Sequence, residues 1–284
     1  MTKECSNKKK NSKMTKTVKF TKMHGAGNDY IYVNTLLYNI DDPSKAAIQW
    51  SAPHTGIGSD GLVLIGDAKI PEADYSMRIF NADGSEAMMC GNGVRCVGKY
   101  VYDKGLTDKK VITVETLSGI KTLELQVVKG KVQSVSVNMG KAEAGLVNRV
   151  RVCDSDVEYI PVSVGNPHAV IFVDDISKAR ITEVGPAMEH NERFPDGVNV
   201  EFVQAISENK LRMRVWERGS GITMACGTGS CATVMAAISI GLCSYNKDIA
   251  VELDGGTLII NISEDNTVTM TGPAEISYEG EVNV

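Results

Sequence analysis

The chain repeats part of its own sequence. When the sequence is shifted by 136 positions, the segment "MRIFNADGSEAMMCGNG", which begins at Met77, aligns with "MRVWERGSGITMACGTG", which begins at Met213. Eight of the thirty positions from 77 to 106 are then identical, whereas average residue usage predicts roughly two matches. The matches include the cysteine and both glycines of a Cys-Gly-x-Gly motif, with Cys90 in the first copy and Cys226 in the second. A repeat of this length predicts two related structural units.

The order of predicted secondary structure repeats as well. After each motif comes a helix-length run that ends at a glycine, Gly105 or Gly241, and glycine favours the left-handed position beyond a helix end. Alternating residues then predict three strands in each copy, "VITVETL", "KTLELQVV" and "VQSVSVNM" in the first and "IAVEL", "GTLIINI" and "TVTMT" in the second. Upstream, "GAGND" precedes the strand-like "YIYVN", and "VGNPH" precedes "AVIFVDD". The sequence therefore predicts two related α/β units, each with mostly antiparallel strands around a helix that begins directly after a cysteine.

Charge and hydropathy argue against several classes of protein. A formal net charge of −5 and a pI near 5.5 argue against a nucleic-acid-binding surface. The Lys-rich tract in residues 1–16 has almost no large apolar side chains, and we predict that it is disordered. The uncharged segment Ala225–Tyr245 has many Gly, Ser and Thr residues and a helical run of only about fourteen residues, which is short for a membrane span. We predict a buried helix there, and no membrane partner.

The cysteine count predicts a reducing environment. The chain has seven cysteines, an odd number, and its N-terminal residues lack the apolar middle of a secretory signal. This pattern indicates free thiols and a cytoplasmic location. The spacings Cys90–Cys96 and Cys226–Cys231 do not match those of zinc ligand pairs, and the four histidines are scattered. We therefore predict no metal site.

A cysteine at a helix N-terminus is a candidate acid or base. The unpaired N–H groups and the positive dipole end there stabilise a thiolate, so we expect the pKa of Cys90 and of Cys226 to lie below the ordinary value of about 8.5. The glycines after each cysteine let an anionic group such as a carboxylate approach the backbone. The alternative is that both cysteines only pack in the core, as free cysteines often do.

Two facing cysteines would suit inversion at a carbon atom. If the repeated units face each other, one thiolate can remove a proton from one face of a substrate while the opposite thiol delivers a proton to the other face. The C–H beside an amino-acid carboxylate is a very weak acid, so the reaction needs positioning, exclusion of water and stabilisation of charge by the two helix ends. The sequence has no signature of an electron-sink cofactor, and we predict none.

Five segments in the same order resemble the diaminopimelate epimerase family: "FTKMHGAGNDYIYVN", "FNADGSEAMMCGNGVRC", "VGNPHAV", "GVNVEFV" and "WERGSGITMACGTGSCA". The resemblance extends from about Val18 to near the C-terminus. It implies a pyridoxal-independent isomerase that interconverts LL- and meso-diaminopimelate in the biosynthesis of lysine and peptidoglycan precursors. The substrate would be a small amino acid, and the enzyme would use no cofactor.

The resemblance also implies roles for individual residues. Cys90 and Cys226 would be the base and the acid, and would exchange roles with the direction of the reaction. The reacting carboxylate would be bound at the helix starts by Gly91, Asn92, Gly227 and Thr228. The rest of the substrate would be bound by Asn28, Asn81, Asn166, Asn199, Glu217 and Arg218. The planar fork of Arg218 suits the distant carboxylate, and His168 and Glu217 would tune the thiols.

The implied fold has two pseudosymmetric domains, each a mostly antiparallel sheet wrapped around a central helix, with the active site in the cleft between them. On this basis we divide the chain into the Lys-rich tail, residues 1–16, a first half, residues 17–131, and a second half, residues 132–271. Residues 272–284 would return to the first half. The family also implies a homodimer.

Simpler interpretations stay open for several of these residues. His168 follows a proline turn and suits a protein core, and Glu217 with Arg218 suits a solvated pair. Three asparagines lie in sequences typical of turns: Asn28, Asn81 and Asn166. Two positions depart from the family pattern, which often has Glu in place of Ile222 and sometimes Gln in place of Gly61.

Other functions also fit part of the pattern. A cysteine-nucleophile hydrolase or acyl transferase would need only one of the two cysteines, activated by His168. A thiol redox protein would join Cys90 and Cys226 in a reversible disulfide. A related isomerase, such as a proline racemase, would use both thiols on another substrate. The hydrolase gives no reason for the repeat, and the charged pair Glu217–Arg218 favours a substrate with a second charged end.

Overall fold

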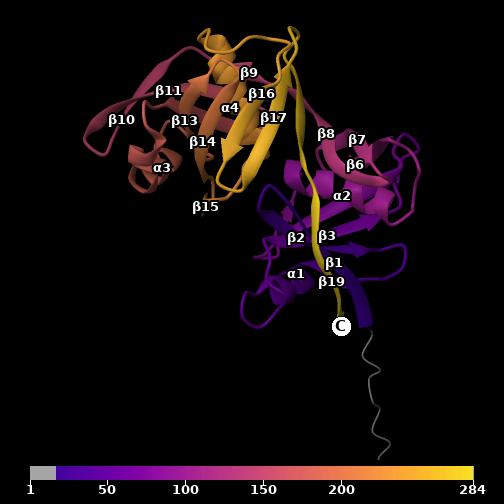
Figure 1. The fold of residues 1–284 in the computed structure, drawn as a ribbon. Helices are drawn as coiled ribbons and strands as arrows, with labels where there is room; N and C mark the ends of the chain where they lie inside the picture. The colour runs from indigo at the N-terminus through magenta and orange to yellow at the C-terminus, as the bar shows by residue number, and fades with distance from the viewer. Residues whose placement is uncertain (1–16, 284) are drawn as a thin grey trace, which may run out of the picture.

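The computed structural model describes residues 17–283, which form a mixed α/β fold rich in strands (Figure 1). The tail that we predicted to be disordered, residues 1–16, lies outside the described residues. The helices are α1 (Pro43–Ser51), α2 (Gly91–Asp103), η1 (Ile176–Lys178, a 3-10 helix), α3 (Ile181–Glu189) and α4 (Gly227–Ser239). The strands are β1 (Thr17–Gly25), β2 (Asn28–Asn34), β3 (Gly61–Gly66), β4 (Tyr75–Asn81), β5 (Glu86–Ala87), β6 (Val111–Thr116), β7 (Gly119–Val128), β8 (Lys131–Lys141), β9 (Glu143–Ala144), β10 (Asn148–Val152), β11 (Ser155–Ser163), β12 (Pro167–Phe172), β13 (Asn199–Ser207), β14 (Lys210–Glu217), β15 (Gly221–Ile222), β16 (Ile249–Leu253), β17 (Gly256–Ile262), β18 (Thr267–Pro273) and β19 (Glu275–Asn283).

Both predicted helix starts are confirmed. α2 begins at Gly91 and α4 at Gly227, so each helix starts one residue after a cysteine of the repeat, and each is 13 residues long. The glycines that follow the two helices, Gly105 and Gly241, have φ of +72° and +78°. This left-handed conformation ends a helix, and it strains any residue that carries a Cβ atom.

The repeat in sequence is also a repeat in topology. The strands form one hydrogen-bonded ladder in the order β19–β1–β2–β3–β4–β6–β7–β8–β18–β17–β16–β14–β13–β12–β11. β2–β3 and β4–β6 are parallel pairs in the first copy, and β12–β13 and β14–β16 are the equivalent parallel pairs in the second. The other neighbours in this ladder are antiparallel, and the β8–β18 pair joins the two copies.

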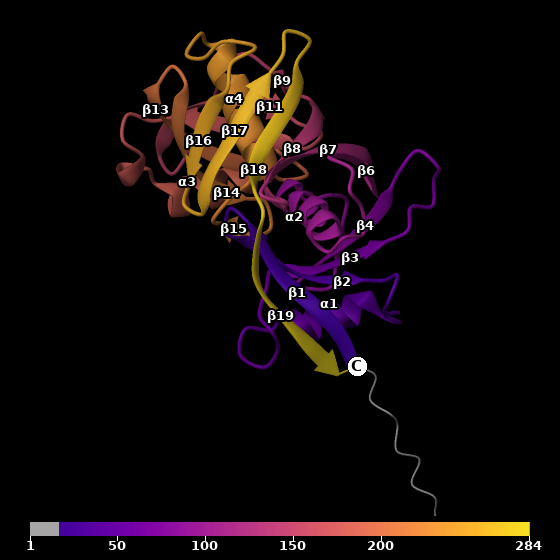
Figure 2. The ribbon, with the colours of Figure 1, turned by 45° about the vertical axis from the view of Figure 1, so that its right-hand side comes forward.

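Strands surround each helix of the repeat. α2 packs against β1, β2, β7 and β8, and α4 packs against β9, β11, β12, β13 and β17. Figures 1 and 2 show α2 in a lobe coloured mainly indigo to magenta and α4 in a lobe coloured rose to yellow. Eleven of the 13 residues of each helix are buried, which is why α4 can lack charged side chains. Within residues 17–283, no helix has the length and apolar character needed to cross a membrane.

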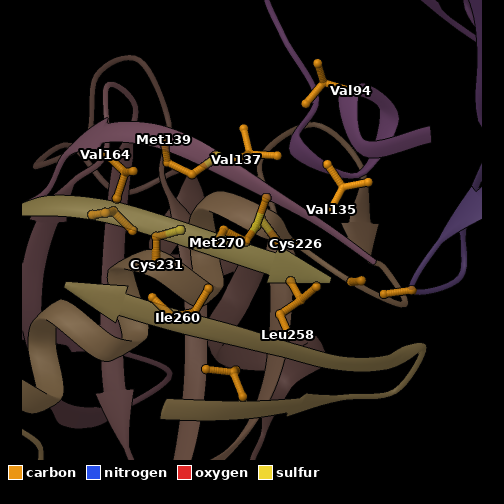
Figure 3. Close-up of a cluster of buried hydrophobic side chains, with 14 of the residues drawn as sticks. Val94, Val135, Val137, Met139, Val164, Cys226, Cys231, Leu258, Ile260 and Met270 are labelled. Atoms are coloured by element: carbon orange, nitrogen blue, oxygen red, sulfur yellow. The ribbon is translucent and has the colours of Figure 1, made fainter. Parts of the chain in front are cut away.

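The largest hydrophobic cluster extends across both lobes. Val94 of α2 and Cys231 of α4 belong to a single cluster of buried side chains that continues through Met270 of β18 (Figure 3). β18 leads into β19, which crosses to the first lobe and pairs with β1, from Thr17 opposite Asn283 onward (Figure 2). This cluster holds the N-terminal ends of α2 and α4 close together.

Candidate active site

Cys90 and Cys226 are the N-cap residues of α2 and α4. Each has an extended backbone, with φ of −133° at Cys90 and −122° at Cys226, so that the side chain turns back over the first helical turn. The N–H groups of Gly93 and Gly229 donate to the two sulfur atoms, each over 3.3 Å. The sulfur atoms therefore take the place of the usual capping oxygen, and each satisfies an N–H group that the helix leaves without a partner.

The first residues of the two helices lie close together. A Cβ atom added to Gly227 would be 3.8 Å from the Cα atom of Gly91. The Met270 side chain lies beside both glycines, because its Cε atom would be 2.7 Å from a Cβ on Gly91 and its Sδ atom 3.2 Å from a Cβ on Gly227. Two helix N-termini, each with a positive dipole end and a thiol, therefore meet at one place.

The Cys90 thiol faces the start of β2. It donates to the side-chain oxygen of Asn28, with 3.2 Å between sulfur and oxygen. Asn28 Nδ2 in turn donates to Asp60 Oδ2 over 2.7 Å, and Asn92 Nδ2 donates to Asn28 Oδ1 over 3.5 Å. The structure thus brings three of the predicted site residues, Cys90, Asn28 and Asn92, into one hydrogen-bonded group.

The Cys226 thiol has a similar group of neighbours. Its sulfur atom lies 3.7 Å from the Thr228 hydroxyl oxygen, to which Asn166 Nδ2 donates over 3.4 Å. Asn166 Oδ1 lies 3.0 Å from His168 Nε2. Asn28 and Asn166 therefore belong to the groups around Cys90 and Cys226, respectively, and four predicted site residues lie together in the second group.

Glu201 belongs to the second group, but the sequence analysis did not single it out. It lies on β13, its Oε1 atom is 2.7 Å from His168 Nδ1, and both side chains are fully buried. Its other oxygen, Oε2, is buried and has no hydrogen-bonding partner among the described residues. The signal in the sequence was a single acidic residue inside the apolar strand "NVEFV", because acidic residues are rarely buried unless they are paired.

The expectation that the helix starts lower the pKa of both thiols is wrong. Burial raises the pKa of Cys90 above its ordinary value, although the helix-start N–H groups and Arg95 act in the opposite direction. Burial raises the pKa of Cys226 well above its ordinary value, and the carboxylates of Glu217 and Glu201 add to this effect. The removal of sulfur from water therefore outweighs the hydrogen bonds at the helix ends.

Glu217 is close enough to both thiols to act on them electrostatically. The Thr223 hydroxyl donates to its carboxylate, and burial raises the pKa of Glu217 despite this hydrogen bond and a second one from Cys226. The charge of Glu217 raises the pKa of Cys226, and it also raises the pKa of Cys90. A carboxyl group in this place can therefore modulate both cysteines.

Two other predicted site residues, Asn199 and Arg218, lie at the same end of the β13–β14 pair. The Arg218 N–H donates to Asn199 Oδ1 over 3.0 Å, and the Arg218 guanidinium donates to the carbonyl oxygen of Asp196 over 2.8 Å. Arg218 also lines a surface pocket formed mainly by residues 189–197. Asn81 differs from the other predicted residues, since its amide donates to Ser85 Oγ within its own turn.

The two departures from the family pattern have different surroundings. A Cβ atom on Gly61 would be 2.1 Å from the carbonyl oxygen of Phe80, so a side chain at this position requires movement of the neighbouring strand. Ile222 lies opposite Trp216 in the β14–β15 pair and is 41% exposed. Gly61 is therefore fixed by the backbone around it, whereas Ile222 is open to substitution.

A buried cation, Arg95, lies on α2 behind Cys90, and the sequence analysis also missed it. Its guanidinium donates to the carbonyl oxygens of Gly91 and Pro273, each over 3.2 Å, and to Asn92 Oδ1 over 2.9 Å. The side chain is fully buried, and within residues 17–283 no carboxylate forms an ion pair with it. Arg95 therefore joins the start of α2 to the end of β18, and its positive charge favours ionisation of Cys90.

The chain is similar to one family of known proteins over most of its length. The family model described as diaminopimelate epimerase matches residues 20–144 and 160–277. The chain is 56% identical over 271 residues to a diaminopimelate epimerase of Bacteroides thetaiotaomicron, covering 95% of this chain and 99% of that protein. It is 54% identical over 287 residues to the diaminopimelate epimerase of Phocaeicola vulgatus, covering 95% and 100%. The fold is similar to that of a hydroxyproline epimerase from Agrobacterium vitis, with a TM-score of 0.75, 16% identity and coverage of 94% and 93%.

Proposed function

This chain belongs to the diaminopimelate epimerase family, and we propose that Cys90 and Cys226 are its two acid–base groups. The epimerisation of diaminopimelate, a reaction of lysine biosynthesis, is the activity of this chain. The observation that carries the proposed mechanism is the close approach of two helix starts, each of which is capped by a thiol.

In the proposed reaction one cysteine is a thiolate and the other is a thiol when the substrate binds. The thiolate takes the proton from the α-carbon and becomes a thiol, and the electron pair of the C–H bond stays on the substrate, delocalised into its carboxylate. The opposite thiol gives its proton to the other face of that carbon and becomes a thiolate. Burial raises the pKa of both thiols, so the thiolate that removes the proton is a strong base, while a smaller share of the enzyme carries a thiolate at neutral pH.

The two helix starts would bind the carboxylate next to the reacting carbon. N–H groups in the first turn of a helix have no partner within the helix, and they point along the positive end of its dipole. As the carbon loses its proton, negative charge moves onto the carboxylate, so two helix ends stabilise the transition state more than the bound substrate. The N–H groups assigned to this role are those of Gly91, Asn92, Gly227 and Thr228.

The polar side chains around the two thiols would hold the rest of the substrate. Diaminopimelate carries an ammonium and a carboxylate at its far end, and the neighbouring charges of Glu217 and Arg218 match this pair. His168 and Glu217 would tune the thiols. The complete set of side chains assigned to substrate binding is Asn28, Asn81, Asn166, Asn199, Glu217 and Arg218.

We also propose a division of the chain into two domains. Residues 17–131 with 272–284 would form one domain and residues 132–271 a pseudosymmetric second domain, each with a sheet around its central helix, and the substrate would bind in the cleft between them. The repeated order of parallel and antiparallel pairs and the pairing of β19 with β1 support this division. We also propose that the enzyme is a cytoplasmic homodimer.

Isotope exchange tests the two-thiol mechanism. Purified enzyme incubated with LL-diaminopimelate in D2O, without pyridoxal phosphate, is expected to give meso product with deuterium at the inverted α-carbon. Cys90→Ala and Cys226→Ala should each lower turnover by at least about 1,000-fold, because either change leaves one face of the carbon without a proton donor or acceptor.

The buried cysteines outside the helix caps provide matched controls. Cys96 and Cys231 are fully buried but cap no helix, so Cys96→Ala and Cys231→Ala should keep most of the activity of the folded enzyme. Full activity of Cys226→Ala would contradict the two-thiol mechanism and favour a single cysteine nucleophile. A product without solvent deuterium would contradict it as well.

A further inference from the structure

We propose that Glu201 is a positioning residue for Cys226: it holds the His168 ring in its doubly protonated form, and this ring orders the side chains around the thiol. The inference rests on the role proposed above for Cys226. It concerns only the second copy of the repeat, because the first copy has no equivalent pair.

Glu201 and His168 form a buried pair inside the second lobe. They lie on the adjacent parallel strands β13 and β12, where Glu201 is opposite Val170. Both side chains have zero exposure, and 2.7 Å separates Oε1 from Nδ1. A buried carboxylate without an opposite charge is strongly disfavoured. A protonated imidazole at this distance supplies both an opposite charge and a hydrogen bond, so the buried pair favours the charged ring.

The second ring nitrogen, Nε2, also faces an oxygen atom. His168 Nε2 lies 3.0 Å from the side-chain oxygen of Asn166, while the Asn166 amide nitrogen donates to Thr228. Both ring nitrogens therefore face oxygen atoms that accept hydrogen bonds. Only the doubly protonated ring can donate to both at once. The ring thereby fixes the Asn166 amide, which is in turn bonded to the Thr228 hydroxyl beside Cys226.

The Glu201 carboxylate also lies directly against the start of α4. A Cβ atom on Gly229 would be 2.8 Å from Glu201 Oε1 and 3.1 Å from Cys226 Sγ. The carboxylate oxygen and the sulfur atom therefore flank the same point of the helical turn. The glycine at position 229 leaves room for both.

The first copy of the repeat has no pair equivalent to Glu201 and His168. In the β3–β4 and β13–β14 registers, Val63 lies opposite Ile79 where Glu201 lies opposite Val215, and residues 79 and 215 are matched by the repeat. In the parallel pair β2–β3, Tyr32 lies beside Val63, and in β12–β13, Val170 lies beside Glu201. Tyr30 and His168 each lie two residues before these positions, so Tyr30 takes the place of His168 in the first copy. An apolar residue and a phenol thus replace the charged pair near Cys90. The two thiols of a symmetric fold therefore differ in their surroundings.

Nitrogen-15 NMR of the unmodified enzyme tests the protonation state directly. The chain has four histidines, and the His168 signals can be assigned by replacing the other three, His24, His54 and His190, one at a time with glutamine. At about pH 7.5, where an exposed histidine is mostly neutral, both ring nitrogens of His168 are expected to carry protons. A ring with a single proton contradicts the proposal.

Thiol reactivity tests the positioning role. The rate of alkylation by iodoacetamide, followed for each cysteine by peptide mass spectrometry, should change at least about threefold at Cys226 in Glu201→Gln at about pH 8, because a ring that loses the carboxylate also loses its second proton and no longer fixes Asn166 and Thr228 beside the sulfur. Cys90 is the internal control, and its rate should change by less than about twofold. Turnover should fall at least about tenfold.

These readouts separate this proposal from the two-thiol mechanism, because neither NMR nor alkylation depends on turnover. Equal changes at Cys90 and Cys226 would indicate a general loosening of the fold and contradict the proposal, and unchanged rates at both would do so as well. If Glu201→Gln does not fold, the NMR measurement on the unmodified enzyme decides the question.

Discussion

Gly91 and Gly227, the first residues of the two repeated helices, lie so close together that a Cβ built on Gly227 would be 3.8 Å from the Gly91 Cα. Each follows a capping cysteine, so this close approach brings together two helix caps that are 136 positions apart in the chain. Met270 from β18 fills the space beside both glycines. The active-site geometry therefore depends on the packing of two glycines and on a methionine side chain that takes no part in the reaction.

Gly91→Ala is expected to displace the methionine side chains that pack beside the helix starts. The new methyl group would meet the Cε atom of Met270 at 2.7 Å, and because that atom is the end of a flexible side chain, the cost should lie near the lower end of the about 1–3 kcal/mol typical of overpacking. Displacement of the thiols by a fraction of an ångström should lower kcat by about 10- to 100-fold. Combined with Met270→Leu, which removes the clashing end of the side chain, Gly91→Ala should recover part of this loss in steady-state assays. No recovery in the double variant would show that packing beside the helix starts does not set the thiol separation.

The same substitution at the third position of each helix should have unequal effects. A Cβ on Gly229 would be 2.8 Å from Glu201 Oε1, whereas a Cβ on Gly93 would be in ordinary contact, at 3.4 Å, with the Cys90 side chain. Gly229→Ala should therefore lose about 1–3 kcal/mol of unfolding free energy in urea titrations. Gly93→Ala should be neutral, or more stable by up to about 1 kcal/mol, since alanine favours helix. Equal destabilisation of both variants would contradict the asymmetric packing.

Arg95→Met is expected to make Cys90 a weaker acid. The Arg95 charge lowers the pKa of Cys90 against the larger effect of burial, so its removal should raise that pKa and slow alkylation of Cys90 at about pH 8. Arg95→Lys, which keeps the charge, should react more like the unmodified enzyme. The Met variant should also lose about 2–4 kcal/mol of stability, because it leaves buried oxygen acceptors without donors. Equal alkylation rates in the Met and Lys variants would rule out the electrostatic explanation.

Stability is expected to fall in alkaline solution because of two buried thiols. Burial raises the pKa of Cys96 to about 11 and that of Cys231 to about 12, whereas both titrate near pH 8.5 in the unfolded chain. The folded state therefore holds more protons than the unfolded state above pH 8.5. Each thiol stabilises the fold fully below that pH and loses this contribution as pH rises towards its folded pKa, by up to about 1.4 kcal/mol per pH unit. In denaturant titrations from pH 8 to 10, the variant with Cys96→Ala and Cys231→Ala should lose stability less steeply; an equal slope would contradict this account.

Local sequence predicted the helices and strands around the site well. The runs "IAVEL" and "GTLIINI" are strands with the predicted bounds, and both helices begin directly after their cysteines. Such features depend on neighbours within a few residues of each other, which a single sequence displays. The thiol pKa values were predicted in the wrong direction for the opposite reason, because burial depends on strands from elsewhere in the chain.

The sequence by itself determined that the chain contains two copies of one unit, with a cysteine at the start of each central helix, because periodicity, capping and turn residues act over short distances. Only the tertiary structure decided that the two helix starts lie close together, that Arg95 is buried behind Cys90, and that Glu201 is paired with His168 beside Cys226. These relationships join residues 33 or more positions apart, or depend on exclusion of water by strands from the other copy. Dielectric environment and side-chain packing arise only when those strands come together, and they distinguish two thiols that the sequence presents as equivalent.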